Sequence, residues 1–326
     1  MNPAILRPYR DSDAGALAHL YNEGLVHPSR IRLNADTVRR RWLDHHAFRA
    51  SEGSWIAEGP DGTVNAAAHL LFDEASDTAP IPEVRLRFWL LASAERARSH
   101  PELVRRLVSL AMEAAGRAPR RGGFRYFVGS NAMVGETWRE DFLSGAGLRP
   151  ARSFLTMRHD RLETLATPGS VAGLHIQGWR PEFDLGTWQA FNEAFRDHWG
   201  YQEIPYEEFR RMAHGPDSQP HLWQIAIDKS SGEVAGINLT GVTPSSDSPS
   251  REGWVHDLAV RRTWRGRGLG HALLLAGMRV LRDATGIDSM LLTVDRENPS
   301  GALGLYRKTG FEVAYEQRAW EALLNR

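Results

Sequence analysis

Cysteine is absent from the 326-residue sequence, and its absence excludes several kinds of chemistry. Without thiols the chain cannot form a disulfide, bind a metal through thiolates or use a cysteine nucleophile. Lysine is nearly absent too, because Lys229 and Lys308 are the two lysines among 40 basic residues. The 40 acidic residues balance that charge, and no block of five basic residues occurs. No excess charge therefore favours nucleic acid or an anionic membrane as a partner.

The chain also has no long hydrophobic run. Its first ten residues contain no apolar segment of the kind found in secretion signals, and the most apolar predicted helix is interrupted by Arg279. We therefore expect a soluble, cytoplasmic protein. A hydrophobic content of 42% in a chain of this length is enough to build two domain cores.

A glycine- and arginine-rich turn is the most informative feature that is present. Residues 265–270 read Arg-Gly-Arg-Gly-Leu-Gly, between a strand-like run at 255–260 and an amphipathic helix at 269–284. Glycines let the backbone turn tightly and direct its N–H groups to one point, where the positive end of the helix attracts an anion. The arginines can add charged donors to the same oxygens. The segment predicts a pyrophosphate site made by Arg265, Gly266, Arg267, Gly268, Leu269 and Gly270.

Two common phosphate motifs fit this turn poorly. A Walker loop needs Gly-Lys-Ser/Thr before its helix, but His271 and Ala272 follow Gly270, so a P-loop NTPase is excluded. A Rossmann turn would lack its third glycine, because His271 stands there, although Asp288 lies near the position of the ribose-binding acid. A nicotinamide-dependent oxidoreductase is thus a disfavoured alternative.

The turn resembles the phosphate-binding motif of the GCN5-related N-acetyltransferases, the GNAT family, which reads Arg/Gln-x-x-Gly-x-Gly/Ala. A second block of that family follows at the family's usual separation, with Asn298-Pro299 after a strand-like run and then Leu305-Tyr306 and Gly310-Phe311. Two independent blocks at this separation are a stronger signal than either motif alone. The resemblance implies an acyltransferase with a mixed α/β fold that uses acetyl-CoA as co-substrate.

The resemblance also implies roles for particular residues. The family pairs the pantetheine arm with the backbone of the strand before the turn, here Leu258, Ala259 and Val260, and one N–H there can polarise the thioester carbonyl. Asn298 would orient the pantetheine or cap the next helix, although one inserted residue, Gly301, alters its usual spacing from the tyrosine. Tyr306 would protonate the departing thiolate; otherwise it is an aromatic core residue.

Two candidate bases for the incoming amine, His256 and Asp257, lie on the same predicted strand. An alternation of period two sets His256 on the face of Trp254, Leu258 and Val260, with Asp257 on the other face. His256 is the first candidate, because arylalkylamine N-acetyltransferases carry histidine at the matching position, and Asp257 is the second. A packed, structural histidine is the alternative.

The amine acceptor should enter opposite the cofactor, over the loop between the first two helices of the second half. That loop is rich in aromatic and acidic residues suited to a cationic amine, although it could equally be a packing loop. Its candidate binding residues are Trp199, Tyr201, Glu203 and Tyr206. We expect a small-molecule or peptide amine as acceptor, with no nucleic-acid or membrane partner. No metal is expected, since the scattered histidines His45, His46, His214 and His221 form no ligand pattern.

The two halves of the chain repeat each other at an offset of 170 residues. Tyr21-Asn22-Glu23 corresponds to Phe191-Asn192-Glu193, and each half ends in a similar helix–turn–strand pattern. The repeat predicts two tandem GNAT-like domains, each with a mixed, largely antiparallel sheet flanked by helices. The expected domains are 1–162 and 172–326, joined by a linker at 163–171 that contains Pro168 and Gly169.

The first half is, by this pattern, a degenerate copy. Where the second half has its glycine turn, the first has residues 97–102 without glycine and with Glu102, and Leu143 stands where the second half has Tyr306. We therefore expect catalysis in domain 172–326 and a non-catalytic domain 1–162. Such a tandem arrangement resembles mycothiol synthases, which suggests an architecture more than a substrate. The alternative function is a non-catalytic acyl-CoA-binding or sensor module.

Overall fold

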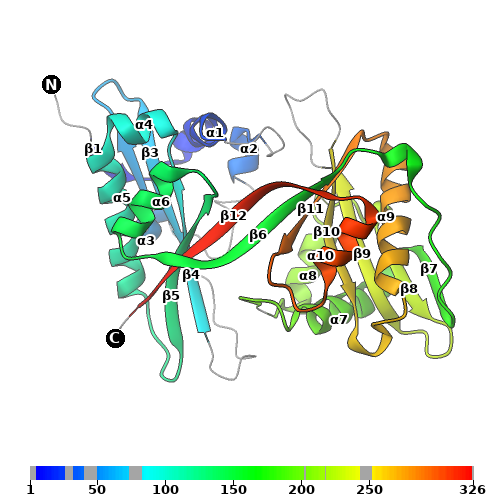
Figure 1. Cartoon of the computed structure of the whole chain (residues 1–326). Coiled ribbons are helices and arrows are strands. Elements are labelled where there is room, and N and C mark those ends of the chain that lie inside the picture. Colours follow the sequence, from blue (N-terminus) through cyan, green and yellow to red (C-terminus); the bar gives the residue numbers. More distant parts are fainter. Residues whose placement is uncertain are drawn as a thin grey trace. The chain divides into compact units, whose positions relative to one another are not determined.

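The computed structural model describes residues 5–25, 32–39, 50–72, 83–201, 203–216, 218–242 and 252–324 of the chain. It divides into two compact units, each with its own core (Figure 1). Unit 1 comprises Met1–Ser153 and Tyr315–Arg326, and unit 2 comprises Phe154–Ala314. The chain therefore enters unit 2 once and returns to unit 1 at its end.

Unit 1 is a mixed sheet flanked by helices. Its strand order is β1-β2-β3-β4-β5-β12, and its pairs are antiparallel except β4 with β5. The strands are β1 (Ile5–Pro8), β2 (Ser54–Glu58), β3 (Val64–Leu71), β4 (Glu83–Leu91), β5 (Arg125–Met133) and β12 (Glu312–Leu323). The helices are α1 (Ala14–Glu23), α2 (Ala35–Val38), α3 (Ala50–Gly53), α4 (Ala94–Ser99), α5 (Pro101–Arg117) and α6 (Thr137–Gly145).

Unit 2 repeats this plan in the order β7-β8-β9-β10-β11-β6, again with one parallel pair, β10 with β11. The strands are β6 (Arg149–His159), β7 (Leu174–Gly178), β8 (Gln224–Asp228), β9 (Val234–Val242), β10 (Glu252–Val260) and β11 (Ser289–Asp295). The helices are α7 (Asp184–Phe195), α8 (Tyr206–Ala213), α9 (Leu269–Thr285) and α10 (Ala302–Thr309). The predicted α/β class, with mixed, largely antiparallel strands flanked by helices in each unit, is confirmed.

The last strand of each unit comes from the other half of the chain. Strand β6 follows α6 of the first half but pairs with β11, where Phe154 lies opposite Asp295. Strand β12 follows α10 of the second half but pairs with β5, where Gln317 lies opposite Met133. Each half does end in helix–turn–strand, as the repeat predicts, but the strands are exchanged.

The units divide the chain elsewhere than at the predicted linker, 163–171. The change from unit 1 to unit 2 falls at Ser153–Phe154, because β6 already belongs to the second sheet. The start of the predicted linker is packed onto α9: Arg279 donates to the carbonyl of Leu165 at 3.1 Å, and Arg282 donates to that of Leu162, the residue before the linker, at 2.8 Å. Residues 245–250, which are rich in serine and are predicted from the sequence to form a flexible hairpin loop, lie outside the described residues.

Matching hydrogen bonds support the internal repeat. The side chain of Asn22 bonds both the N–H and the C=O of Leu33, at 2.8 and 2.7 Å. Asn192, 170 residues later, makes the same two bonds to Ile204, both at 3.1 Å. A side-chain amide that bonds both the backbone N–H and the C=O of one later residue fixes the path of the chain after the helix. The segments that follow α1 and α7 are held in this same way.

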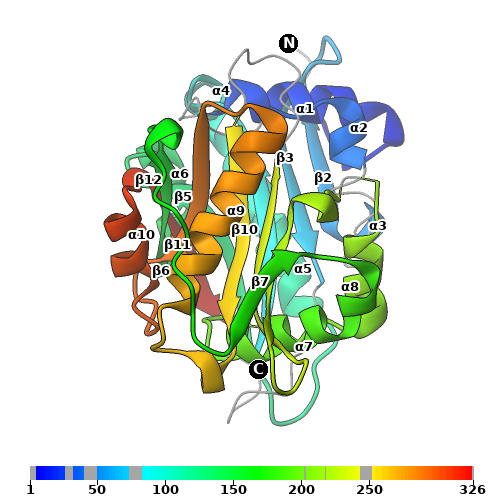
Figure 2. The same ribbon diagram turned by 90° about the vertical axis from the view of Figure 1, so that its right-hand side faces the viewer.

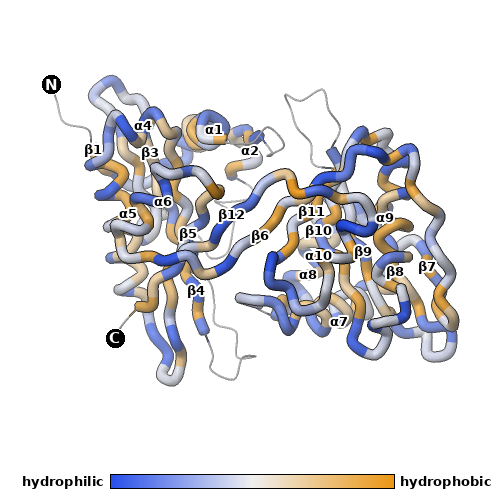
Figure 3. The backbone as a smooth tube through the Cα atoms, in the orientation of Figure 1, coloured by the Kyte–Doolittle hydropathy of each residue, from blue (hydrophilic) through white to orange (hydrophobic). Residues whose placement is uncertain are grey.

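Helix α9 lies against one face of the unit 2 sheet (Figure 2), and α7 packs on the other. Leu269 and Leu273 of α9 join one buried cluster and Met278 joins another, whereas Ala190 of α7 packs with Ile237. Figure 3 shows polar and apolar residues interspersed along the helices. Among the described residues, no helix combines the length and apolar character that crossing a bilayer would require.

Candidate functional site

The pairing of strands β10 and β11 ends before β10 reaches the glycine turn, and the candidate site begins where the two strands separate. They pair only from Glu252 to Val255 on β10, opposite Ser289 to Leu292 on β11. Beyond that point β10 continues to Val260 with its other edge paired to β9. The edge facing β11 therefore offers N–H and C=O groups that no neighbouring strand of the described sheet uses, as an extended ligand requires.

The glycine turn and the start of α9 form an anion cradle next to this open edge. Gly266 and Gly268 have φ angles of 76° and 80°, in the left-handed region that favours glycine. Gly268 is the N-cap of α9, and the first turn of the helix carries no acidic residue. The first-turn N–H groups of a helix have no intrahelical partners, so they are free to bind an anion.

A cavity of about 220 Å³ joins the open edge, the cradle and the start of α10. Nine of the predicted cofactor residues line it, and Arg267 and Asn298 do not. The lining residues are Ala194, Phe195, His198, Leu258, Ala259, Val260, Trp264, Arg265, Gly266, Gly268, Leu269, Gly270, Ser300, Gly301, Ala302, Leu305 and Tyr306.

The two arginines of the turn are placed differently. Arg265 donates from Nε to the carbonyl of Val260 at 2.9 Å and from Nη2 to that of Ala194 at 3.2 Å. Arg267 is exposed and donates to the carbonyl of Thr263 within its own turn, at 3.2 Å. Arg265 thus joins β10 to α7, whereas the hydrogen bond of Arg267 is made within the turn.

Asn298 organises the loop before α10. Its side-chain oxygen accepts the N–H of Ser300 at 2.8 Å, which is an Asx turn. Gly301, with φ of 76°, is the N-cap of α10 and lines the cavity. Asn298 is therefore not the cap of α10, and the extra residue Gly301 takes that position because a left-handed conformation is needed there.

Tyr306 is fixed in the cavity wall by an aromatic contact. Its ring meets that of Phe311 edge-on with centroids 6.1 Å apart, and the residue is 7% exposed. Burial, together with the nearby charge of Asp257, raises the pKa of Tyr306 to about 12. The phenol consequently keeps its proton at neutral pH and has that proton available to donate.

A β-bulge at His256 overturns the period-two assignment of the strand faces. Val255 lies opposite Thr240 and Asp257 lies opposite Leu239, so His256 is an extra residue. Leu239 packs in the cluster on the α7 side, which places Asp257 on that face. A Cβ added at Gly241 would lie 3.1 Å from Nε2 of His256.

Gly241 neighbours Thr240 on β9 and shares the α7 face with Leu239, as alternate residues of a strand do. The bulge thus puts His256 and Asp257 on one face, although regular alternation separates them. His256 is exposed and Asp257 is partly buried. Burial raises the pKa of Asp257 to about 7.

His198 is a cavity residue that the sequence reasoning did not select. It follows α7, its ring meets Phe195 edge-on with centroids 4.6 Å apart, and it lines the same cavity as Tyr306. Burial lowers the pKa of His198, opposed by the charge of Asp295. The only sequence signal was its place in the aromatic loop, which did not distinguish it from its neighbours.

The four residues proposed for the acceptor do not line this cavity. Trp199 packs against Phe154 with ring centroids 5.9 Å apart, and Tyr206 meets Trp188 edge-on at 5.5 Å. The hydroxyl of Tyr201 donates to Asn192 at 2.8 Å. Glu203 is exposed. Three of the four thus have packing partners, and acceptor binding by this loop stays a prediction.

Unit 1 has a cavity of about 280 Å³ at the corresponding split, beyond the paired segment Glu83–Arg87 of β4. It has no glycine cradle. Near the start of α4 the carboxylate of Glu23 accepts the hydroxyl of Ser93 at 3.0 Å and Nε of Arg96 at 2.9 Å. Glu102 lies in the first turn of α5. Carboxylates near these helix starts disfavour a second anion.

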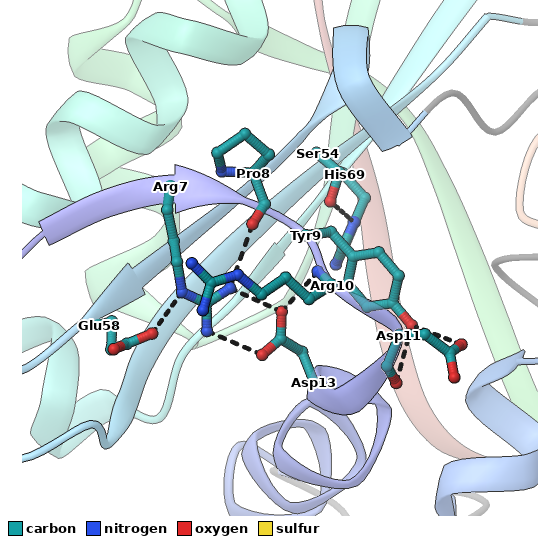
Figure 4. A network of polar contacts seen from close by, with 9 residues as sticks. All are labelled: Arg7, Pro8, Tyr9, Arg10, Asp11, Asp13, Ser54, Glu58 and His69. Carbon is teal, nitrogen blue, oxygen red and sulfur yellow. Dashed lines mark hydrogen bonds and ion pairs between the residues drawn. The ribbon is translucent and has the colours of Figure 1, made fainter.

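A second polar cluster lies in unit 1 (Figure 4). Arg7 donates to both oxygens of Asp13 at 2.8 Å. Burial opposes ionisation of Asp13, but the bonds from Arg7 and the Arg10 amide outweigh it and lower its pKa. Ser54 and His69 share a hydrogen bond of 2.8 Å, and burial lowers the pKa of His69 to about 4. His69 is 1% exposed, so this cluster is structural.

No trio of His, Asp or Glu side chains in the described part of the chain is arranged to hold a metal ion. Nε2 of His214 shares a hydrogen bond of 2.7 Å with the carboxylate of Asp184. His221 is exposed, and His45 and His46 lie outside the described residues.

Comparison with known proteins points to one family. The model of the acetyltransferase (GNAT) family matches residues 186–311, which include the open edge, the cradle and Tyr306. The mycothiol acetyltransferase of Salinispora arenicola is 30% identical over 213 residues, which are 65% of this chain and 67% of that protein. The mycothiol acetyltransferase of Thermobispora bispora is 32% identical over 172 residues, 52% of this chain and 56% of the relative. The chain spans about half the length of several such relatives.

Solved structures support the same architecture over the whole chain. A GCN5-related N-acetyltransferase from Sphaerobacter thermophilus superimposes with a TM-score of 0.75 at 23% identity, covering 100% of this chain and 97% of that one. A tandem GNAT protein from the clavulanic acid biosynthesis pathway gives 0.69 at 16% identity, with 99% of both chains covered. At these identities the likeness concerns the fold.

Proposed function

Because the chain belongs to the acetyltransferase (GNAT) family, we propose that it transfers an acetyl group from acetyl-CoA to a primary amine of a small molecule or peptide, by direct attack in a ternary complex. Unit 2 carries the reaction and unit 1 is non-catalytic. One observation carries the proposal: the open edge of β10, the glycine cradle and Tyr306 line a single cavity.

The chain's own groups account for cofactor binding in this proposal. The cradle amides at 266–270 bind the diphosphate, and the pantetheine extends along Leu258–Val260 in the place that a neighbouring strand would take. An N–H of that edge donates to the thioester oxygen, which gains negative charge as the amine attacks. The thioester then lies within reach of Tyr306.

The proton transfers are assigned to Tyr306, which lines the cavity, and to a base on β10. The amine nitrogen bonds to the thioester carbon, the C–S bond breaks, and the leaving sulfur takes the proton of the Tyr306 hydroxyl. The thiol has a pKa of about 8.5, so its thiolate is a weaker base than free tyrosinate. The transfer therefore depends on a direct hydrogen bond from the Tyr306 hydroxyl to the sulfur. His256 or Asp257, on the opposite face of the strand from α9, takes the proton that the amine loses.

The need for that base depends on the acceptor. A lysine-like amine is neutral at pH 7 at a cost of roughly 4–5 kcal/mol, whereas an α-amine or sugar amine costs only about 1–1.5 kcal/mol. Positioning can supply much of the catalysis for the second class. The relatives named mycothiol acetyltransferase favour a small-molecule amine as acceptor.

A thiol-release assay tests the proposal. The full chain is incubated with acetyl-CoA and a panel comprising an amino sugar, a peptide with a free N-terminus and an alkylamine, and free CoA is measured. We expect release that depends on at least one amine and is absent from a Gly268→Glu variant, which sets a carboxylate in the cradle. Tight acetyl-CoA binding without amine-dependent release would instead favour the non-catalytic acyl-CoA-binding module.

A further inference from the structure

Arg265 bridges two elements whose residues line the unit 2 cavity. Its Nε bonds the carbonyl of Val260 at the end of β10, and its Nη2 bonds the carbonyl of Ala194 near the end of α7. Its Nη1 lies 3.9 Å from Asp197, just beyond α7. Val260, Ala194 and Arg265 all line the cavity.

The bond to Val260 uses an acceptor of the open edge itself. The N–H of Arg261 bonds the carbonyl of Ala235, so it points toward β9. This N–H and the carbonyl of Val260 belong to one trans peptide group and point in opposite directions, so the carbonyl points toward the edge that β11 leaves open. Arg265 therefore occupies the last acceptor of this edge and limits where an extended ligand can pair.

Planar guanidinium geometry makes this bridge possible. One guanidinium presents donors in fixed directions and can bond two carbonyls at once, whereas a lysine ammonium cannot keep both bonds from the same stem. Arg267 offers the matched comparison, because it has the same charge, lies two residues away and donates to the carbonyl of Thr263 within the turn.

We propose that the side chain of Arg265 is a positioning residue that joins β10 to α7 and sets the pantetheine-binding segment of the cavity, rather than a charge for the diphosphate. This inference rests on the proposed function, since it concerns the same cofactor. It assigns the two arginines of the turn to different parts of one ligand: Arg265 to the pantetheine arm and Arg267 to the phosphates.

Binding of two fragments of the cofactor separates these roles. S-acetylpantetheine carries the arm without the diphosphate, and 3′-phosphoadenosine 5′-diphosphate carries the phosphates without the arm. Affinities of both are measured by titration calorimetry for the wild type, Arg265→Ala, Arg265→Lys and Arg267→Ala, with melting temperatures as a control for folding.

We expect Arg265→Ala and Arg265→Lys to weaken S-acetylpantetheine binding about fivefold or more, because one or both hydrogen bonds from the Arg265 guanidinium are lost. Both variants should change the affinity for the nucleotide less than about twofold. Arg267→Ala should do the reverse, and its nucleotide affinity should depend less on salt. Recovery of wild-type affinity in Arg265→Lys, or a loss confined to the nucleotide, would overturn the inference. A wild type that binds neither fragment nor acetyl-CoA would instead refute the proposed function.

Discussion

Tyr306 and Asp257 are two residues whose ionisation burial opposes, with different chemical consequences. The phenol keeps its proton, because its pKa rises to about 12, and the carboxyl loses its proton only near neutrality, because its pKa rises to about 7. One residue is thus suited to donate a proton and the other to accept one at the same pH.

Replacing Tyr306 by phenylalanine removes the hydroxyl and keeps the ring that packs on Phe311. We expect kcat to fall about 100-fold or more, the range of a lost general acid, with the KM for acetyl-CoA changed less than about threefold. Steady-state thiol release measures both. Tyr126→Phe is the control, since that hydroxyl accepts a backbone N–H in unit 1, at Arg121. Equal kcat in Tyr306→Phe and the wild type would exclude the acid role.

The raised pKa of Asp257 gives a pH prediction for activity. If Asp257 is the base, kcat/KM for the amine rises with pH through about 7, because only the ionised carboxylate accepts a proton. Asp257→Asn should abolish this rise and His256→Ala should retain it. The opposite pattern in the two variants would assign the base to His256.

The same group gives a prediction for stability. The folded pKa of Asp257 lies above its ordinary value, so its stabilising contribution is present at low pH and is lost as pH rises through about 7. Asparagine stays neutral throughout. Asp257→Asn should therefore melt higher than the wild type at pH 8, with a smaller difference at pH 5. Calorimetric scans at both pH values check this, and a larger gain at pH 5 would contradict it.

At the scale of elements, α9 packs closely against the sheet where Gly277 of the helix meets Asn238 of β9. Asn238 of β9 is fully buried, and its Nδ2 donates to the carbonyl of Leu273 at 2.8 Å. A Cβ added at Gly277 would lie 2.2 Å from that nitrogen. Because α9 carries the cradle at its N-terminus, this contact helps to fix the cradle's position against β10.

Gly277→Ala should push α9 away from β9 and lower the free energy of unfolding by about 1–3 kcal/mol, the cost of overpacking a core. The matched control is Gly304→Ala in α10, where an added Cβ meets nothing within 4 Å. That variant should be neutral or more stable by up to about 1 kcal/mol. Urea unfolding of both proteins gives the comparison, and equal stability of the two would refute the packing argument.

At the scale of the whole molecule, this member of the GNAT family is built from two similar halves that exchange their last strands. Unit 2 without β6 would leave β11 with an unpaired edge, and unit 1 without β12 would leave β5 in the same position. Exposed strand edges promote aggregation and lower stability. The exchange therefore makes each unit depend on the other half of the chain.

Two fragments test this dependence. Fragment 154–314 follows the compact unit and keeps the part of β6 that pairs with β11, Phe154–His159, whereas fragment 172–326 follows the sequence repeat and lacks β6. We expect 154–314 to be the more soluble of the two and to melt at a higher temperature, as followed by circular dichroism. A higher melting temperature for 172–326 would mean that β12 replaces β6 beside β11 and that the exchange is dispensable.

The sequence by itself determined the features that depend on local chemistry. Glycine at 266 and 268 permits a left-handed turn, the 3.6-residue period predicts α9, and the repeated Asn22 and Asn192 indicate a duplicated fold. These signals lie within short stretches of chain, so they can be read without knowing what packs against them. They located the cradle, the tyrosine and the two-domain class.

Tertiary structure decided what depends on distant partners. The bulge at His256 arises from pairing with β9 and overrides the simple alternation. The 3.6-residue period predicts an apolar stripe on α9 that includes Leu273 and Ala284. The buried face is different, with Leu274 and Met278 also buried and Ala284 exposed, because two hydrophobic clusters contact the helix. The exchange of β6 and β12 depends on pairing between residues far apart in sequence, and hydrophobic alternation carries no information about which strand will be the neighbour.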